Sequence, residues 1–478
     1  MPDSGAMTDA VPDIPYLAQL VREQMPARLA HVARVRGLAP VAPDAAFTYC
    51  DLGCGPGFTA AAVAALHPQA TVHAVDVQPG HAESARALAR AGGLANLHVH
   101  TADFRDLPAL PAFDVIALHG VWSWIDAATR DAVAAFLADH LRDGGYAYVS
   151  YNALPGAAAS APVRRLLQRH AAALPDTMDP AVKARRALAA VQDLRDQGGW
   201  FADNPVAARA VDDLATRDPA YVAHEFLGGT WEPFYHDTVA AEMARAGLAF
   251  AADAEPALNH TDAVLPDAAL DGLKAAPDPG AVELHKDFLL SRGFRRDVYG
   301  RAPAALDEAA RTEALLGAPY HLTVDRAAFT EQCHVGRVTL TLRGPAFDLL
   351  LDGLEQGTAR PADFPRVQGL DAEARRAVAT AVDFLVARGQ AELALEPARP
   401  TRAAGRALAF RPALNRTLLD AAFRRGGAEQ AAAISPVTGD AVTVPRAHGE
   451  ALLRAADGEA VEADTLAPYL RLGVLDDA

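Results

Sequence analysis

A glycine-rich loop that joins an apolar stretch to a helical stretch constrains this chain more than any other feature. Residues 47–52 read Phe-Thr-Tyr-Cys-Asp-Leu, glycines follow at 53, 55 and 57, and a helical pattern occupies residues 58–66. Glycines after a strand let the backbone approach a ligand closely, and a helix N-terminus offers free N–H groups. The sequence therefore predicts a strand–loop–helix unit that binds a ligand between Asp51 and Gly57.

Strands and helices alternate through the first third of the chain. The expected strands are residues 47–52, 71–76, 97–101, 113–118 and 146–151, and the expected helices are 58–66, 79–91 and 126–141, with a turn at 143–145. Apolar strands that alternate with helices form mostly parallel sheets covered on both faces. The predicted fold class is α/β, with a Rossmann-like, doubly wound, mostly parallel sheet.

Five parts are expected along the chain. They are a disordered tail (1–14), a ligand-binding core (15–156), a helical insertion (157–218), a segment that completes the core (219–302) and a C-terminal domain (303–478). The insertion is interpreted as a cap or a dimerisation element, and the latter makes a homodimer the expected assembly.

Secondary structure outside the central alternation is also predicted from hydrophobic periodicity. Residues 16–38 are expected to be helical in two pieces, the second beginning at Pro26. Residues 221–227 and 247–252 are expected to be the strands that complete the sheet, and residues 268–299 are expected to be helical.

The C-terminal domain is expected to be α+β and winged-helix-like. Strand patterns at 320–324, 338–342 and 391–395 surround helical patterns at 346–355 and 371–388. Because the whole chain is acidic, this module is interpreted as a site of protein contacts and not as a DNA-binding domain.

Composition excludes several classes of protein. The net charge is −16, which argues against a nucleic-acid partner, and the basic residues between 292 and 301 are interpreted as a solvated surface or as salt bridges. Three cysteines, Cys50, Cys54 and Cys333, suit neither a disulfide framework nor a zinc site, so no metal is expected. No signal peptide or apolar run of about 18–20 residues is present, so no membrane association and a cytoplasmic location are expected.

Polar residues follow the later strands at matching positions. Asp76 ends the second strand, Asp103 and Phe104 follow the third, and His119 follows the fourth. Ligands of such sheets gather at the carboxyl ends of the strands, where a carboxylate accepts from ribose hydroxyls. We therefore expect Asp76 to bind a ribose, and Asp103 with Phe104 to contact an adenine.

The glycine spacing argues against a dinucleotide. The pattern is G-x-G-x-G, whereas dinucleotide-binding loops carry G-x-G-x-x-G. Asp76 would also repel a 2′-phosphate, which argues against NADP. An NAD-dependent dehydrogenase is therefore the weaker interpretation.

Together these segments resemble the class I S-adenosylmethionine (AdoMet)-dependent methyltransferases. Further stretches, residues 119–125, 148–156, 223–236 and 294–298, resemble the bacterial branch that carries a methyltransferase regulatory domain and includes rickettsial enzymes that methylate protein lysines. The resemblance is specific over residues 15–301. It implies AdoMet as the cofactor and methyl transfer as the activity.

The resemblance also implies roles for individual residues. The expected cofactor-binding residues are Asp51, Gly53, Cys54, Gly55, Gly57, Asp76, Val77, Asp103, Phe104 and His119. Pro56 departs from many branch members, and because proline lacks an N–H donor it is expected to alter contacts within the loop without preventing binding.

The expected catalytic residues are His119 and Tyr151, and the expected substrate-binding residues are Trp122, Tyr151, Asn152 and Glu225. The acceptor is expected to be a protein lysine amine. A small-molecule N- or O-methyltransferase and a non-catalytic AdoMet-binding regulator remain as alternatives, because fold alone does not decide the acceptor. The fourth strand lacks a following Asn-Pro-Pro-Tyr, which argues against amide, adenine and glutamine acceptors.

Overall fold

The computed structural model describes residues 20–324, 326–335, 338–396, 408–425 and 428–477. The expected disordered tail at 1–14 lies outside these residues. Among the described residues, no helix has the length and apolarity needed to cross a bilayer, and no three His, Cys, Asp or Glu side chains gather as metal ligands.

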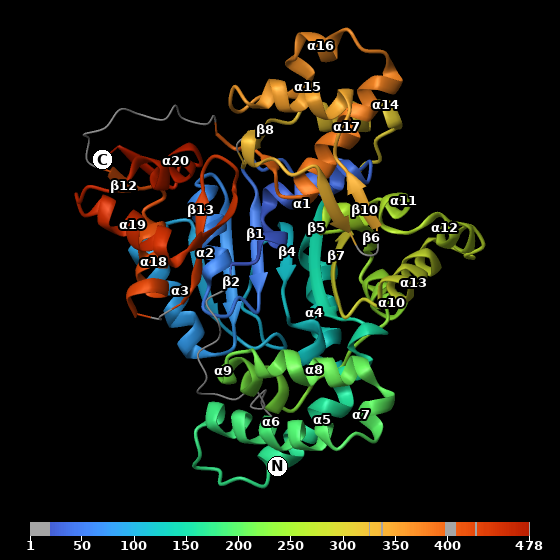
Figure 1. The fold of residues 1–478 in the computed structure, drawn as a ribbon, viewed down its shortest axis with the longest axis vertical. Coiled ribbons are helices and arrows are strands. Elements are labelled where there is room, and N and C mark those ends of the chain that lie inside the picture. Colours follow the sequence, from blue (N-terminus) through green and yellow to red (C-terminus); the bar gives the residue numbers. More distant parts are fainter. Residues whose placement is uncertain (1–19, 325, 336–337, 397–407, 426–427, 478) are drawn as a thin grey trace.

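A seven-stranded sheet forms the centre of the molecule (Figure 1), with the order β3-β2-β1-β4-β5-β7-β6. Its strands are β1 (Thr48–Leu52), β2 (Thr71–Asp76), β3 (Leu97–Thr101), β4 (Phe113–Leu118), β5 (Leu141–Asn152), β6 (Ala249–Asp253) and β7 (Phe294–Gly300). Strands β1 to β5 are parallel, and β7 runs antiparallel to both of its neighbours. The predicted α/β, Rossmann-like class is confirmed.

Helices bury both faces of this sheet. One face packs against α1 (Pro26–Val35), α2 (Phe58–Leu66) and α3 (Pro79–Gly92), and the other packs against α4 (Ala127–His140) and α10 (His236–Arg245). Apolar strand residues such as Val72 and Ile116 are fully buried between these layers, as the apolar strand pattern predicts.

The strand that completes the sheet is β7, so the prediction of helix across 268–299 is wrong at its end. Helix α13 (Pro279–Leu290) stops at Ser291, which has a positive φ of 51°, and β7 then inserts between β5 and β6. Of the two interpretations of the basic residues between 292 and 301, a solvated surface or salt bridges, the structure shows salt bridges, and the side chains of Arg295 and Asp297 are fully buried. Arg295 pairs with Asp297, Asp287 and Glu283, which offsets the cost of burying the charges.

A packed helical unit spans residues 157–227, at the carboxyl ends of the strands (Figure 1). Its main helices are α5 (Ser160–Ala171), α6 (Pro180–Asp196) and α8 (Pro205–Ala215). The prediction of a strand at 221–227 is wrong, because α9 (Pro219–Val222) leads into a π-helical turn (Ala223–Leu227). Val222 and Ala223 bury against the unit's own core, a tertiary contact that overrides the strand-like local sequence.

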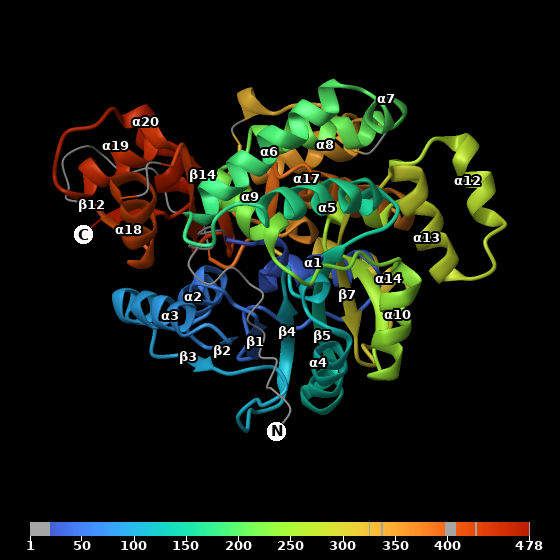
Figure 2. The same ribbon diagram turned by 90° about the horizontal axis from the view of Figure 1, so that it is seen from below.

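The C-terminal part folds around two separate hydrophobic clusters, which we call lobe 1 (308–396) and lobe 2 (408–477). Lobe 1 contains α15 (Pro345–Leu354), α17 (Ala372–Ala387) and the strand pair β8 (Tyr320–Leu322) and β11 (Ala391–Leu393). Lobe 2 contains α18 (Leu414–Leu419), α19 (Arg446–Ala456), α20 (Ala463–Arg471) and the hairpin β13 (Gln430–Ser435) and β14 (Asp440–Pro445). Figure 2 shows lobe 2 and the α12–α13 pair on opposite sides of the core, α12 being Asp267–Lys274.

Of the helix predicted over residues 16–38, residues 16–19 lie outside the described residues, and only the second piece, beginning at Pro26, forms an α-helix. A 3-10 turn (Arg22–Gln24) precedes α1, which begins at Pro26. Ala27 and Val35 of α1 belong to the hydrophobic cluster of lobe 1, while Leu29 and Val32 belong to the cluster beneath the sheet. Helix α1 therefore joins lobe 1 to the core.

Candidate active site

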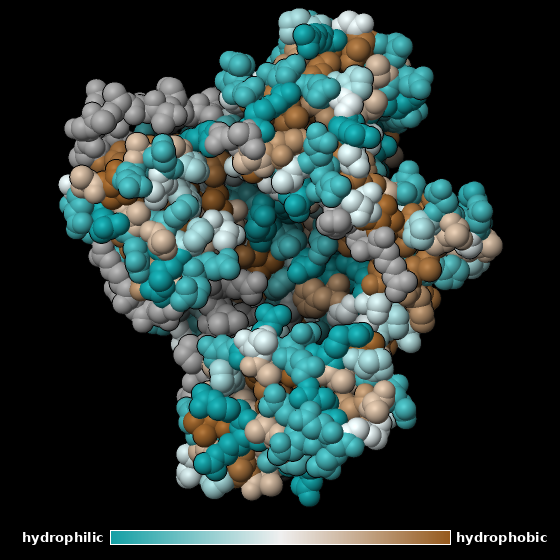
Figure 3. Space-filling model, viewed as in Figure 1, coloured by the Kyte–Doolittle hydropathy of each residue, from teal (hydrophilic) through white to brown (hydrophobic). Residues whose placement is uncertain are grey.

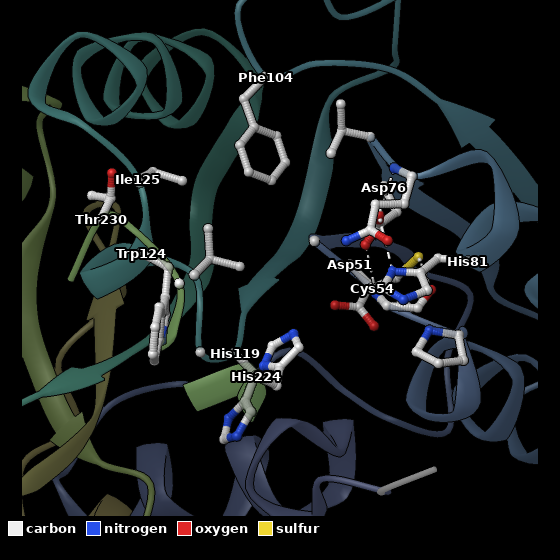
Figure 4. Close-up of a pocket in the computed structure, with 18 of the residues that line it drawn as sticks. Asp51, Cys54, Asp76, His81, Phe104, His119, Trp124, Ile125, His224 and Thr230 are labelled. Atoms are coloured by element: carbon white, nitrogen blue, oxygen red, sulfur yellow. Dashed lines mark hydrogen bonds and ion pairs between the residues drawn. The ribbon is translucent and has the colours of Figure 1, made fainter. Parts of the chain in front are cut away.

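A cavity of about 640 Å³ lies at the carboxyl ends of β1, β2 and β4. Figure 4 shows Asp51, Cys54, Asp76 and His81 gathered on one side of it, and Trp124, Ile125 and Thr230 on the opposite side. His119 and His224 also line the cavity and are drawn between the two groups in this view. The cavity therefore has two chemically different halves, one acidic and glycine-lined and one aromatic.

The glycine loop shapes the first half. Gly53 has a φ of +78°, and a Cβ there would lie 2.5 Å from Cγ2 of Val121, so only glycine fits. The Gly53 and Cys54 N–H groups donate to the carbonyl of Val75 at 2.8 and 3.0 Å, and the Gly57 N–H donates to the Cys54 carbonyl at 3.0 Å. The hydrogen bonds of the loop are therefore donated by residues other than Pro56, and the missing N–H group of this proline removes none of them.

Asp76 connects this loop to the cavity. Its Oδ2 accepts from the Gly55 N–H at 2.9 Å, and its Oδ1 accepts from the Gln78 N–H at 2.9 Å and lies 3.2 Å from Nδ1 of His81. These bonds fix the carboxylate at the end of β2 while leaving it part of the cavity wall, beside Val77. The position agrees with the predicted ribose contact, and Gln78 and His81 are wall residues that the sequence reasoning missed.

Asp51 is a buried carboxyl group in the same wall. It is 2% exposed, and burial raises its pKa to about 7, with nearby Asp76 adding to the rise. A buried carboxyl group of this kind favours a cationic ligand, which would restore its ionised form. The ammonium group of an amino-acid ligand has that chemistry.

Binding of such a ligand is expected to depend on pH. The affinity for S-adenosylhomocysteine (AdoHcy) should rise about tenfold from pH 6 to pH 8, because the ionised fraction of Asp51 increases through a pKa of about 7. Without ligand, the raised pKa of Asp51 has the opposite effect on folding. The unfolded chain ionises Asp51 more easily than the folded protein does, so the free energy of unfolding falls as pH rises toward 7. Calorimetry across this range checks the dependence, and Asp51→Asn serves as the control that should flatten it.

Two expected cofactor residues do not line the cavity. Asp103 turns away and holds Arg105 in a bidentate pair, with contacts of 2.9 and 2.8 Å, whereas Phe104 and Arg105 do line the wall. Gly57 lies behind the loop at the start of α2, where a Cβ would come within 2.4 Å of Cβ of Ala85. Gly57 therefore permits close packing of the loop on α3 and is not a ligand contact.

His119 lies between the halves, as predicted, but its surroundings argue against a basic role. Nδ1 is 2.9 Å from the Tyr148 hydroxyl and 3.2 Å from Oγ of Ser150. Burial and, to a smaller extent, nearby Arg296 together lower the pKa of His119 to about 3. An imidazole with that pKa stays neutral at pH 7 and is a poor acceptor for a proton from an amine, so it suits hydrogen bonding to a ligand.

The structure contradicts the roles predicted for Tyr151 and Trp122. Tyr151 is fully buried, donates to Oδ2 of Asp297 at 2.7 Å and does not line the cavity. Trp122 is also fully buried, and its Nε1 donates to Glu242 at 3.1 Å. Both side chains are packed in the hydrophobic cluster between the sheet and helices α4 and α10, so neither reaches a ligand.

The second half of the cavity uses their neighbours instead. Asn152, from the end of β5, and Trp124 both line it. The helical unit and the loop after it add Tyr221, His224, Glu225 and residues 228–230, a set we call the acceptor wall. Glu225 and Asn152 were predicted, whereas Trp124, Tyr221 and His224 were missed as cavity residues.

Arg164 of α5 holds the acceptor wall in place. Its guanidinium donates to the backbone carbonyls of Glu225 and Gly228 and lies 5.1 Å from the ring of Trp124 and 5.5 Å from that of Trp231. Burial lowers the pKa of Arg164 to about 10, although nearby Glu225 opposes the change. One buried cation thus joins the helical unit to both sides of the second half.

The described residues fit AdoMet. Asp76 presents a fixed carboxylate, Asp51 presents a buried acid, and Phe104 offers an aromatic wall. These groups match a ribose, an ammonium and an adenine in turn. The sheet order, the glycine loop and the acid at the end of β2 together have the arrangement of the class I AdoMet-dependent methyltransferase fold.

Comparison with known families agrees with this class. A methyltransferase domain family matches residues 50–145, and a family described as a predicted methyltransferase regulatory domain matches residues 218–301. The chain therefore contains a methyltransferase domain, for which AdoMet is the cofactor, and a methyltransferase regulatory domain.

Several proteins are similar to this chain. An uncharacterized protein of Synechocystis sp. is 33% identical over 317 residues, which cover 65% of this chain and 62% of that protein. An uncharacterized protein of Rickettsia prowazekii is 27% identical over 297 residues, covering 61% and 53%. The chain thus covers less than two thirds of the length of either relative.

A solved structure shares the fold. PKMT2 from Rickettsia typhi, in complex with AdoHcy, has a TM-score of 0.72 and is 18% identical, over 95% of this chain and 91% of that one. The likeness extends through the helical unit and both C-terminal lobes, since it covers nearly the whole chain.

Proposed function

We propose that this protein transfers the methyl group of AdoMet to a lysine amine of a protein acceptor. The observation that carries the proposal is the division of the cavity, with the glycine loop and Asp76 in one half and Trp124, Asn152 and Glu225 in the other. An aliphatic stem packs against an aromatic ring, and an amine pairs with a carboxylate. The resemblance to rickettsial lysine methyltransferases supports the same acceptor.

When bound, AdoMet supplies an electrophilic methyl group on a sulfonium, so the protein needs to align the acceptor more than to activate it. In the proposed reaction the amine nitrogen forms a bond to the methyl carbon, the carbon–sulfur bond breaks, and neutral AdoHcy leaves. The amine must enter unprotonated, and the aromatic wall around Trp124 favours the neutral form by limiting its hydration. Asn152 and Glu225 orient the nitrogen, and the methylated ammonium that forms releases one of its two N–H protons to water or to Glu225.

Labelled-methyl transfer tests this function. Purified protein is incubated with a bacterial lysate and methyl-labelled AdoMet, and the label is traced to proteins or small molecules and mapped by peptide mass spectrometry. We expect label on lysine in protein. Label in small molecules would favour a small-molecule methyltransferase, and AdoMet binding without any transfer would favour a non-catalytic regulator, so either result would overturn the proposal.

Arg164→Met is expected to separate the two halves of the cavity. Without the guanidinium the carbonyls of Glu225 and Gly228 lose their donor, and a misplaced acceptor wall should reduce methyl transfer about 10- to 100-fold. The Kd for AdoHcy, measured by calorimetry, should change little, because the glycine loop lies on the other side. Arg165→Met, one residue along the same helix and exposed, is the matched control. A similar loss in both variants would contradict the assignment.

A further inference from the structure

The short segment Val21–Met25 forms part of the cavity wall, and we call it the strap. Val21 and Gln24 line the cavity beside the glycine loop. The Val21 N–H donates to Oγ1 of Thr59 at 3.1 Å, and the Tyr49 hydroxyl donates to Oε1 of Gln24 at 3.1 Å. The inner side of the strap is therefore attached to α2 and β1 of the core.

The outer side of the strap is attached to both C-terminal lobes. Nη2 of Arg22 lies 2.5 Å from Oε1 of Glu392 in lobe 1 and 3.0 Å from Oδ2 of Asp440 in lobe 2. Arg28, at the start of α1, approaches the same two oxygens at 2.8 and 3.2 Å. Two arginines and two carboxylates thus form a compact ionic cluster.

Burial makes this cluster strong and directional. The side chains of Glu392 and Asp440 are 5% and 4% exposed, so water and salt screen them little. Removing one member leaves its partners buried without full compensation, and the remaining chain must move to hydrate them. The strap itself is a single 3-10 turn without a side-chain cap, so the ionic cluster is its attachment on the outer side.

A third contact ties the strap to the regulatory domain. Glu23 lies 3.6 Å from Arg296 of β7, whose guanidinium also covers the ring of the cavity residue Phe294 at 5.1 Å. Three consecutive strap residues, Arg22, Glu23 and Gln24, therefore contact the C-terminal lobes, the regulatory domain and the core respectively. Figure 3 shows a largely hydrophilic hollow between the lobes and the helical unit.

We propose that Glu392 and Asp440 act through Arg22 as positioning residues that hold the strap against the cofactor, so that the C-terminal lobes control how tightly the cavity retains it. The proposal rests on the AdoMet-binding function proposed above. It gives lobes 1 and 2 a role in cofactor binding although none of their described residues lines the cavity. Any partner that pulls the lobes apart would release the strap and loosen the cofactor.

The test compares Glu392→Gln, Asp440→Asn and Arg22→Gln with Asp383→Asn. Asp383 of α17 is equally buried and also links lobe 1 to the rest of the protein, through His31 at 2.7 Å and His260, but it does not contact the strap. The Kd and dissociation rate of AdoHcy are measured for each full-length variant by calorimetry and stopped-flow fluorescence, together with the melting temperature.

Each strap variant is expected to raise the Kd about tenfold, mostly through faster dissociation, a size typical of coupling between sites. Asp383→Asn should lower the melting temperature and leave the Kd unchanged. Arg22→Gln provides a variant that is expected to fold even if the buried carboxylates cannot be replaced, because the Arg22 side chain is 40% exposed.

Two outcomes would overturn the proposal. Wild-type affinity in Arg22→Gln would show that the strap needs no outer attachment, and an equal loss in Asp383→Asn would show that general destabilisation explains the effect. Failure of the wild-type protein to bind AdoHcy is a different result, which would reject the proposed function and the strap together.

Discussion

Asp76→Ala should raise the Kd for AdoHcy about 100-fold. The substitution removes a charged acceptor for the ribose, worth about 3 kcal/mol. It also leaves the Gly55 and Gln78 N–H groups without their acceptor, which loosens the loop. Calorimetry on the purified variant measures the loss directly.

Asp103→Ala is the matched control for this prediction. Asp103 also follows a strand, and the sequence pattern assigns it a cofactor contact, but in the structure its carboxylate does not line the cavity and pairs only with Arg105, which does. We expect its Kd to stay close to that of the wild type. A loss as large as that of Asp76→Ala would mean that the adenine contact predicted from the sequence exists and that the structural placement of Asp103 does not describe the bound state.

Asp297→Ala should destabilise the protein by about 3–5 kcal/mol, the usual result of removing one partner from a buried ion pair. Oδ2 of Asp297 accepts from Tyr151 at 2.7 Å and Tyr299 at 3.0 Å and lies 3.0 Å from Nδ1 of His236, and Oδ1 accepts from Nε of Arg295 at 2.8 Å. All four partners lose their acceptor at once, in the centre of the regulatory domain. Chemical denaturation followed by fluorescence measures the effect.

Asp297 also predicts a sign for the effect of acid. Burial alone would raise the pKa of this carboxyl group, but Arg295 and the hydrogen bonds from His236 and Tyr151 outweigh burial and hold the pKa well below its usual range. Its contribution to stability is therefore complete above about pH 4 and is lost as pH falls further. Glu83→Gln, which breaks the exposed pair with Arg90, should leave the denaturation midpoint unchanged at every pH in this range.

Much of the central fold was predictable because apolar strands and glycine turns are local signals. The strands β3 and β4 and the helix α2 have the predicted bounds. Strand β7 was not predictable in the same way, since its buried charges depend on partners in α13 that no local pattern reveals. The loop 143–145, expected as a turn, lies within β5, where the pairing with β4 shifts register between Phe113 and Val115.

The site was predictable where function requires an unusual residue at a strand end, as at Gly53 and Asp76. The sequence could not show which of two adjacent polar residues lines the cavity. Tyr151 and Asn152 are adjacent in β5, and because side chains alternate between the faces of a strand only one of them reaches the cavity. Tyr148, Ser150 and Asn152 lie on the same side of β5, and Tyr148 and Ser150 contact His119. Tyr151 points to the other side of the strand, and Trp122 does not belong to this strand.

The position of β7 between β5 and β6 has a consequence for the synthesis of the protein. The first five strands are complete at Asn152, yet β5 has an unpaired edge until residues 294–300 emerge, after the whole helical unit has been made. An open strand edge invites pairing with other chains. The nascent protein must therefore wait for about 150 further residues, with its catalytic half exposed to aggregation, and chaperones that protect strand edges should matter most in that interval.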